Sequence, residues 1–230
     1  MFNERHSFSA SSTADFMYKV YAWMAVGLGL SALVASLVAH NPAAIKALVL
    51  SPLRYVVLIA QLAIVLVLPG ILNRINYSTT VVLFSAYAAL MGISLSTLLL
   101  VYTMQSIYLG LAITAGTFGS MALYGYYTKT DLTSLGSFLT MGLFGLIIAM
   151  FANMWFKSPV AQYYISLIAV GIFTLLTAYD VQKIKAIGQQ TMMTDEDGRK
   201  KVAVFCSLIL YLDFINLFIN LLQLFGKRRD

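Results

Sequence analysis

Seven apolar stretches of about 20 residues each follow one another along the chain, with short polar segments between them. A helix needs roughly 20 apolar residues to cross the hydrocarbon core of a bilayer, and each stretch meets that length. Hydrophobic residues make up 60% of the 230 positions and charged residues 10%, which is too apolar for a soluble domain. The sequence therefore predicts an all-α membrane protein whose seven transmembrane helices span residues 20–39, 55–72, 79–101, 107–127, 135–156, 160–179 and 202–225.

These spans divide the chain into three parts. Residues 1–19 form a polar N-terminal tail, 20–226 the seven-helix transmembrane domain and 227–230 a basic C-terminal tail. The first apolar stretch is longer than the core of a signal peptide, so we expect it to remain as an uncleaved span. The helical period of the sixth span continues past Asp180 to Gly188, and a charged loop over residues 194–201 leads into the seventh span.

The 15 lysines and arginines fall between the apolar stretches or at the chain ends. This distribution suits membrane orientation better than nucleic-acid binding, because it creates no basic face on a folded surface. With the N-terminus in the cytoplasm, nine of them lie inside: Arg5, Lys19, Arg74, Lys129, Lys183, Lys185, Arg199, Lys200 and Lys201. The other six, Lys46, Arg54, Lys157, Lys227, Arg228 and Arg229, lie outside. The excess predicts a cytoplasmic N-terminus.

The last apolar stretch carries an aspartate, Asp213, near its middle. Asp213, Asn216, Asn220 and Gln223 follow at steps of three, four and three residues, which places them on one face of a helix. This polar stripe must face protein or water rather than lipid. For Asn216, Asn220 and Gln223, hydrogen bonds that join helices are as reasonable a role as a pore lining. For Asp213 we favour a functional role, because a carboxylate is costly to keep within a membrane.

Asp180 is the second acidic residue within the apolar pattern, and it directly follows the sixth stretch. From the local pattern alone, a functional role and an interfacial ion pair with Lys183 or a loop lysine are equally reasonable. The single cysteine, Cys206, excludes an intrachain disulfide, and no spacing of His, Cys, Asp and Glu resembles a metal site.

The segments around these two aspartates closely resemble a known family. They are Thr177-Ala-Tyr-Asp-Val-Gln-Lys-Ile-Lys185 and Leu210-Tyr-Leu-Asp-Phe-Ile-Asn-Leu-Phe-Ile-Asn-Leu-Leu221. Three more segments agree: Tyr21-Ala-Trp-Met-Ala-Val-Gly27, Leu90-Met-Gly-Ile-Ser-Leu95 and Gly119-Ser-Met-Ala-Leu-Tyr-Gly-Tyr-Tyr-Thr-Lys-Thr-Asp131. Over nearly its whole length the chain is similar to the Bax inhibitor-1 (transmembrane Bax inhibitor motif) family, and within it to the bacterial inner-membrane branch.

The resemblance implies a bundle of six helices around a central seventh, located in the bacterial inner membrane. It also implies a pH-sensitive leak of calcium, with Asp180 and Asp213 as the proton-sensing pair and Arg74 as their latch. Calcium would then be the transported ion, held transiently by the two carboxylates, and no bound cofactor is expected. Asn216, Asn220 and Gln223 would line the path.

The predicted spans put the two aspartates at different depths. Asp213 lies about 11 residues, or roughly 16 Å, into its span, whereas Asp180 lies near the inner edge of its own. Contact between them requires a tilted or axially shifted sixth helix. If they meet in a site with little water, two negative charges cannot comfortably coexist, so we expect one proton to be shared.

Two other classes of function compete with the leak. The protein could bind or inhibit another membrane protein, such as a quality-control protease, as the resemblance to the bacterial branch suggests. Two membrane aspartates are also typical of intramembrane aspartyl proteases. Asp213, however, lies in Leu-Asp-Phe without a Gly-x-Gly-Asp element, and Asp180 is followed by Val-Gln, so we expect no enzymatic activity.

Overall fold

A computed structural model describes the backbone of residues 2–191 and 195–229, and the side chains within these ranges from Ser12 onward. Met1 and Asp230, at the ends of the two predicted tails, and Thr194, at the start of the predicted charged loop, lie outside the described residues.

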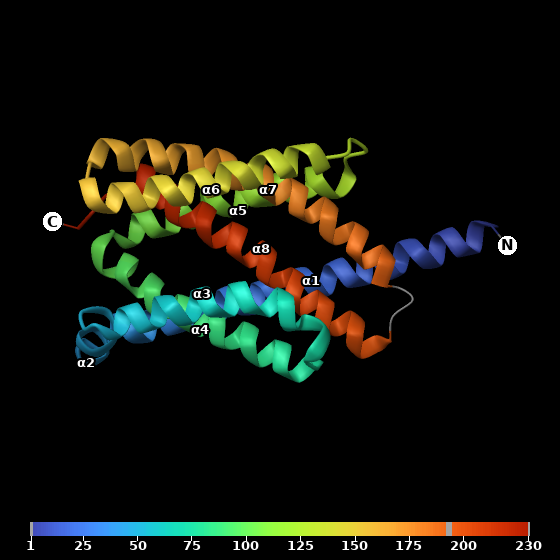
Figure 1. Cartoon of the computed structure of the whole chain (residues 1–230), viewed down its shortest axis with the longest axis horizontal. Helices are drawn as coiled ribbons and strands as arrows, with labels where there is room; N and C mark the ends of the chain where they lie inside the picture. The colour runs from blue at the N-terminus through green and yellow to red at the C-terminus, as the bar shows by residue number, and fades with distance from the viewer. Residues whose placement is uncertain (1, 192–194, 230) are drawn as a thin grey trace. The chain divides into compact units, whose positions relative to one another are not determined.

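The described residues form eight α-helices, seven of which are long and apolar enough to cross a membrane (Figure 1). This confirms the predicted all-α membrane fold. The seven are α1 (Phe2–Ala39), α3 (Leu53–Ile71), α4 (Tyr77–Val101), α5 (Met104–Tyr127), α6 (Thr133–Phe156), α7 (Pro159–Gln190) and α8 (Glu196–Phe225). Between α1 and α3 lie the short α2 (Pro42–Ala44) and the π-helix η1 (Ile45–Val49), and the 3-10 turn η2 (Leu72–Arg74) follows α3.

Local sequence chemistry accounts for several helix ends. The side chain of Asn41 accepts hydrogen bonds from the amides of Ala43 and Ala44, and Pro42 occupies the first turn, where its missing amide costs nothing. The Thr103 hydroxyl accepts from the Ser106 amide at the start of α5. After α6 the chain turns at Lys157, whose φ of 50° is left-handed.

Both helices that carry the aspartates are longer than their predicted spans. α7 continues through the charged residues after Asp180 to Gln190, and α8 already begins at Glu196. Asp180 therefore lies three turns before the end of its helix rather than at its edge. The difference arises because hydropathy marks where a helix leaves the bilayer, whereas backbone hydrogen bonding continues beyond that point.

The chain divides into two compact units, which are described separately. The first contains α1 to α4, α7 from Ile187 onward and α8 up to Tyr211. The second contains α5, α6, α7 up to Ala186 and α8 from Leu212.

In the first unit, α1 and α4 meet at a close approach. A Cβ atom on Gly92 would lie 2.6 Å from the Ser31 carbonyl oxygen, so only glycine allows the two backbones to come this near. The Ser31 hydroxyl lies 2.7 Å from the carbonyl of Ala88 and 2.6 Å from the hydroxyl of Tyr211. Because serine has one proton to give and a carbonyl only accepts, Tyr211 donates to Ser31 while Ser31 donates to Ala88.

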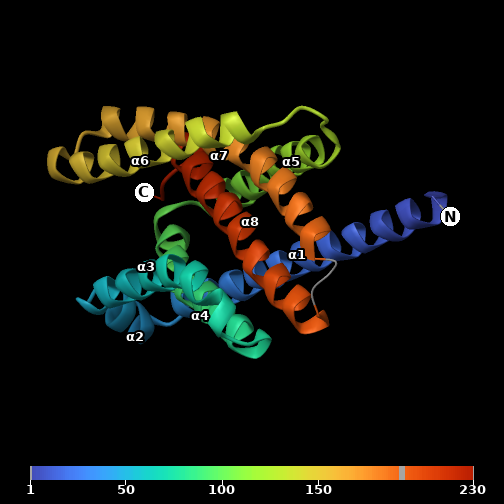
Figure 2. The same cartoon turned by 45° about the vertical axis from the view of Figure 1, so that its right-hand side comes forward.

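In the second unit, α6 and α7 lie side by side along most of their length, as both views show (Figures 1 and 2). α8 is the most buried span: 67% of its most apolar window is buried, against at most 33% for the others. Its high burial agrees with its polar stripe, which cannot face lipid. The arrangement of six helices around α8 stays a prediction from the resemblance.

Membrane orientation can be tested with reporter domains fused after Thr13, at Glu196 and at the C-terminus. Seven spans with the lysine-rich and arginine-rich segments inside place the first two reporters in the cytoplasm and the third on the opposite side. Opposite locations for the reporters after Thr13 and at Glu196 would contradict both the number of spans and the predicted orientation.

Candidate functional site

The structure brings Asp180 and Asp213 together within the second unit. Asp180 is on α7 and Asp213 is on α8, and their side chains lie within hydrogen-bonding reach of each other. Asp213 is only 5% exposed, whereas Asp180 is half-buried. The contact forms despite the different depths that the predicted spans gave the two residues. We call these two residues the carboxyl pair.

A hydrogen bond within the carboxyl pair requires a proton on one of its members, because two ionised carboxylates offer only acceptors. One oxygen of Asp213, Oδ2, is buried and has no hydrogen-bond partner among the described atoms. Among the described side chains, no lysine or arginine forms an ion pair with Asp180 or Asp213 within 4.0 Å. The local alternative of an ion pair between Asp180 and Lys183 is therefore not what the structure contains, although Lys183 is near enough to act on Asp180 through its charge.

Two glycines position the turn of α7 that carries Asp180. A Cβ atom on Gly125 of α5 would overlap the backbone carbonyl of Ala178, and one on Gly136 of α6 would overlap the ring of Tyr179. Such close approaches are available only to glycine. The two residues before Asp180 are thus held between α5 and α6, which limits how far Asp180 can move from Asp213.

The residues after Asp180 hold the loop between α5 and α6. The Gln182 side chain accepts from the Leu132 amide at 2.9 Å and donates to the Thr130 carbonyl at 2.8 Å. Lys185 donates to the carbonyl of Tyr126, near the end of α5, and its ammonium group lies 4.6 Å from the centre of that tyrosine ring. Polar contacts therefore tie the helix of Asp180 to its neighbours within the second unit.

The other members of the predicted stripe continue along α8. The side-chain amides of Asn216 and Asn220 donate to the carbonyls of Leu212 and Asn216, both at 2.8 Å. Since a backbone carbonyl only accepts, the nitrogen of each amide must face the helix backbone and its oxygen Oδ1 must face away from it. The stripe thus presents carbonyl oxygens along α8.

Three residues that the sequence analysis did not single out form a hydrogen-bonded cluster with Gln223, the last member of the stripe. The Gln223 carbonyl oxygen accepts from Ser166 at 2.7 Å and from Gln162 at 2.9 Å. Gln162 in turn accepts from Asn153 of α6 at 3.1 Å. The one signal in the sequence was the spacing of Gln162 and Ser166, one helical turn apart within the apolar sixth span. We call Asn153, Gln162, Ser166 and Gln223 the amide cluster.

Arg74, the predicted latch, is exposed and ends the 3-10 turn η2 that follows α3. It belongs to the first unit, whereas the carboxyl pair belongs to the second. Its role as a latch stays a prediction.

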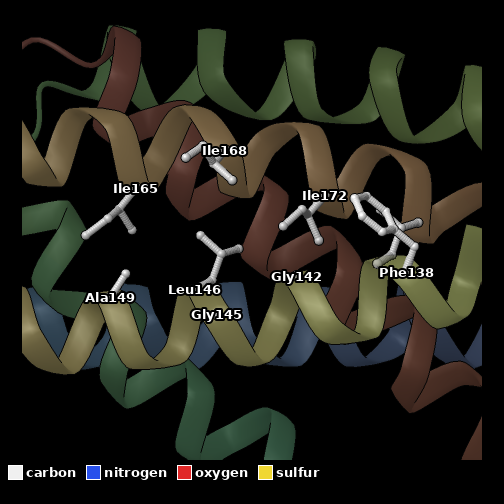
Figure 3. A pocket seen from close by; sticks show the side chains of 9 residues that line it. Phe138, Gly142, Gly145, Leu146, Ala149, Ile165, Ile168 and Ile172 are labelled. Carbon is white, nitrogen blue, oxygen red and sulfur yellow. The ribbon is translucent and has the colours of Figure 1, made fainter.

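A groove of about 350 Å³ lies between α6 and α7 in the second unit (Figure 3). Its side chains are all apolar, so it can accept hydrocarbon and offers no side-chain ligand to an ion or a polar substrate. The lining residues are Phe138, Leu139, Gly142, Gly145, Leu146 and Ala149 of α6 and Ile165, Ile168 and Ile172 of α7.

No group of three or more His, Cys, Asp or Glu side chains that could hold a metal ion occurs among the described residues. Calcium takes six to eight oxygen ligands in a stable site. The carboxyl pair with the nearby Asn216 could therefore contact calcium only in passing.

The fold and the carboxyl pair define a class: a multi-pass helical membrane protein with paired carboxyl groups between its last two transmembrane helices. A family model described as "Inhibitor of apoptosis-promoting Bax1" matches residues 13–230. The chain belongs to this Bax inhibitor family, as the resemblance of its aspartate segments predicted.

Bacterial relatives match over nearly the same length. The inner membrane protein YbhL of Escherichia coli K12 is 43% identical over 215 residues, which cover 93% of this chain and 92% of YbhL. An uncharacterized protein of Borreliella burgdorferi is 44% identical over 217 residues, or 94% of this chain and 93% of the relative. The uncharacterized protein RP147 of Rickettsia prowazekii is 40% identical over 215 residues, or 94% and 90%.

Energetic coupling within the carboxyl pair can be measured with a double-mutant cycle. Asp180→Asn, Asp213→Asn and the double variant are compared by thermal unfolding in detergent. Because one proton must serve both residues, we expect a coupling free energy of about 1–2 kcal/mol. The matched cycle pairs Asp180→Asn with Asp131→Asn, an exposed carboxylate in the loop between α5 and α6. Additive effects in the first cycle would contradict a shared proton.

Proposed function

We propose that this protein is a pH-sensitive leak for calcium ions, gated by the protonation of Asp180 and Asp213. The observation that carries this proposal is the carboxyl pair itself: two acidic side chains within hydrogen-bonding reach of each other on two membrane-spanning helices, with no ion-paired lysine or arginine among the described side chains. A carboxyl group within a transmembrane helix is costly in free energy, so a functional role explains its presence better than packing does.

Protonation supplies the switch. With one proton, the pair carries a single negative charge and is held by the hydrogen bond between its members. A second proton neutralises the pair, so its attraction for a cation such as Arg74 falls. We infer that Arg74 holds the closed state while the pair is charged, and that acidification releases it. The leak therefore increases as the pH falls.

The ligand chemistry favours passage of calcium over its storage. Calcium prefers oxygen ligands, and the carboxyl pair is followed along α8 by the side-chain carbonyls of Asn216 and Asn220. These oxygens are too few and too far apart along the helix for a tight site. An ion that moves along the stripe would exchange one or two protein ligands at a time for water. The second candidate function, binding or inhibition of another membrane protein such as a protease, does not require a row of oxygen ligands along α8.

The leak can be tested with purified protein in liposomes that contain a calcium-sensitive dye. The protein alone should let calcium cross slowly, and the rate should rise as the pH falls from about 8 to about 6, because uptake of a second proton neutralises the carboxyl pair and weakens its attraction for Arg74. Asp213→Asn keeps the shape of the side chain and should lose most of the pH response. Arg74→Ala should raise the basal flux at the higher pH.

Asp131→Asn is the control for a nonspecific effect of charge. The hydroxyl and the amide of Thr133 donate to the Asp131 carboxylate and hold its pKa below its ordinary value, so Asp131 stays ionised over this pH range. Its variant should keep the pH response. A wild-type protein that carries no calcium, or an Asp213→Asn protein with an unchanged pH response, would overturn the leak; the first result would favour a role in binding a partner.

A further inference from the structure

The amide cluster is a second polar site within the second unit. It joins three helices: Asn153 lies near the end of α6, Gln162 and Ser166 lie in the first turns of α7, and Gln223 lies near the end of α8. Its side-chain bonds run from Asn153 to Gln162, and from both Gln162 and Ser166 to Gln223. Hydrogen bonds between neutral side chains add only modestly to helix association in membranes, so added stability is a weak reason for a cluster of four polar side chains.

The cluster lies at the end of the stripe that begins at the carboxyl pair. Gln223 follows Asp213 by ten residues on the same face of α8, which corresponds to about 15 Å along the helix. On α7, Ser166 precedes Asp180 by 14 residues, or about 21 Å. The two helices thus touch through polar groups at both ends of the stripe, while Asn216 and Asn220 lie between these ends on α8.

The carbonyl oxygens of the cluster are all bonded to donors of the protein. The Gln223 oxygen accepts two hydrogen bonds, the Gln162 oxygen accepts one from Asn153, and the Asn153 oxygen accepts the amide of Ser158. The oxygens of Asn216 and Asn220 differ, because they face away from the backbone carbonyls to which these amides donate. An ion that moves along the stripe can be met by oxygens at the asparagines but must displace donors at the cluster.

We propose that the amide cluster is a second constriction of the ion path, in series with the carboxyl pair, and that its side-chain carbonyls bind a partly dehydrated cation when it opens. This inference rests on the proposed leak and adds the place where the ion leaves the protein. The partial burial of the cluster supports it: Ser166 is 1% exposed and Asn153 is 9% exposed, whereas Gln223 is exposed. The cluster therefore connects the interior of the unit with its surface.

If the carboxyl pair and the amide cluster are two barriers in series, the effect of a cluster variant on calcium flux should depend on pH. At about pH 8 the carboxyl pair limits the flux, so weakening the cluster should change little. At about pH 6 the pair is open and the cluster limits the flux. Gln223→Ala, which removes the acceptor of two hydrogen bonds, should then raise calcium flux by at least about fivefold, the effect of losing one neutral hydrogen bond from a barrier.

The experiment measures calcium and potassium flux at both pH values in liposomes that contain the full-length protein. Gln223→Glu accompanies the alanine variant, because it keeps the chain length and the acceptor atoms while adding a negative charge. It should raise calcium flux relative to potassium flux, a ratio that a purely structural tie would not alter. Gln105→Ala, at an exposed glutamine near the start of α5, is the matched control and should behave as the wild type. Thermal unfolding confirms that each variant is folded.

The outcomes separate this inference from the leak itself. If the wild type shows no calcium flux, the proposed leak is wrong, and the proposed second constriction is wrong as well. If the wild type leaks with the expected pH response but both Gln223 variants match it in flux and in ion ratio, only the constriction is wrong. An equal rise at both pH values in Gln223→Ala, with an unchanged ion ratio in Gln223→Glu, would also overturn it, because the cluster would then be a packing element.

Discussion

A carboxyl group inside a membrane is costly in free energy, and this cost constrains how α7 and α8 pack around the carboxyl pair. Asp213 must face protein, so the helix that carries it is the most buried span of the seven. Its partner, Asp180, is brought into hydrogen-bonding contact because α5 and α6 approach α7 closely through Gly125 and Gly136. Small residues on two helices thereby determine the geometry of acidic residues on two others.

The second unit has one polar and one apolar seam between its helices. The seam between α7 and α8 carries the carboxyl pair at one end and the amide cluster at the other, with asparagine oxygens between them on α8. The groove between α6 and α7 is purely apolar and suits hydrocarbon. Of these two seams, only the one between α7 and α8 offers oxygen ligands that would suit an ion.

Hydropathy was sufficient to predict the seven spans, because a membrane helix must be apolar over a known length. The helical period correctly extended α7 past Asp180 to Gly188, two residues short of its end at Gln190. Hydropathy missed the start of α8, where residues 196–201 are mostly charged but helical. Contact between the aspartates followed from the family resemblance and not from the predicted depths. Gln223 was predicted as part of the stripe, but its partners Asn153, Gln162 and Ser166 were missed, because they lie in the fifth and sixth spans and sequence alone does not say which spans are neighbours.

Infrared difference spectroscopy of the protein in lipid gives the most direct test of the central claim, that Asp180 and Asp213 hold a proton between them and take up another as the pH falls. A spectrum taken between about pH 8 and about pH 6 should contain a protonated-carboxyl band that grows with acidity. The band should vanish in Asp213→Asn and persist in Asp131→Asn. A protein without such a band, or one whose band survives in Asp213→Asn, would contradict the account.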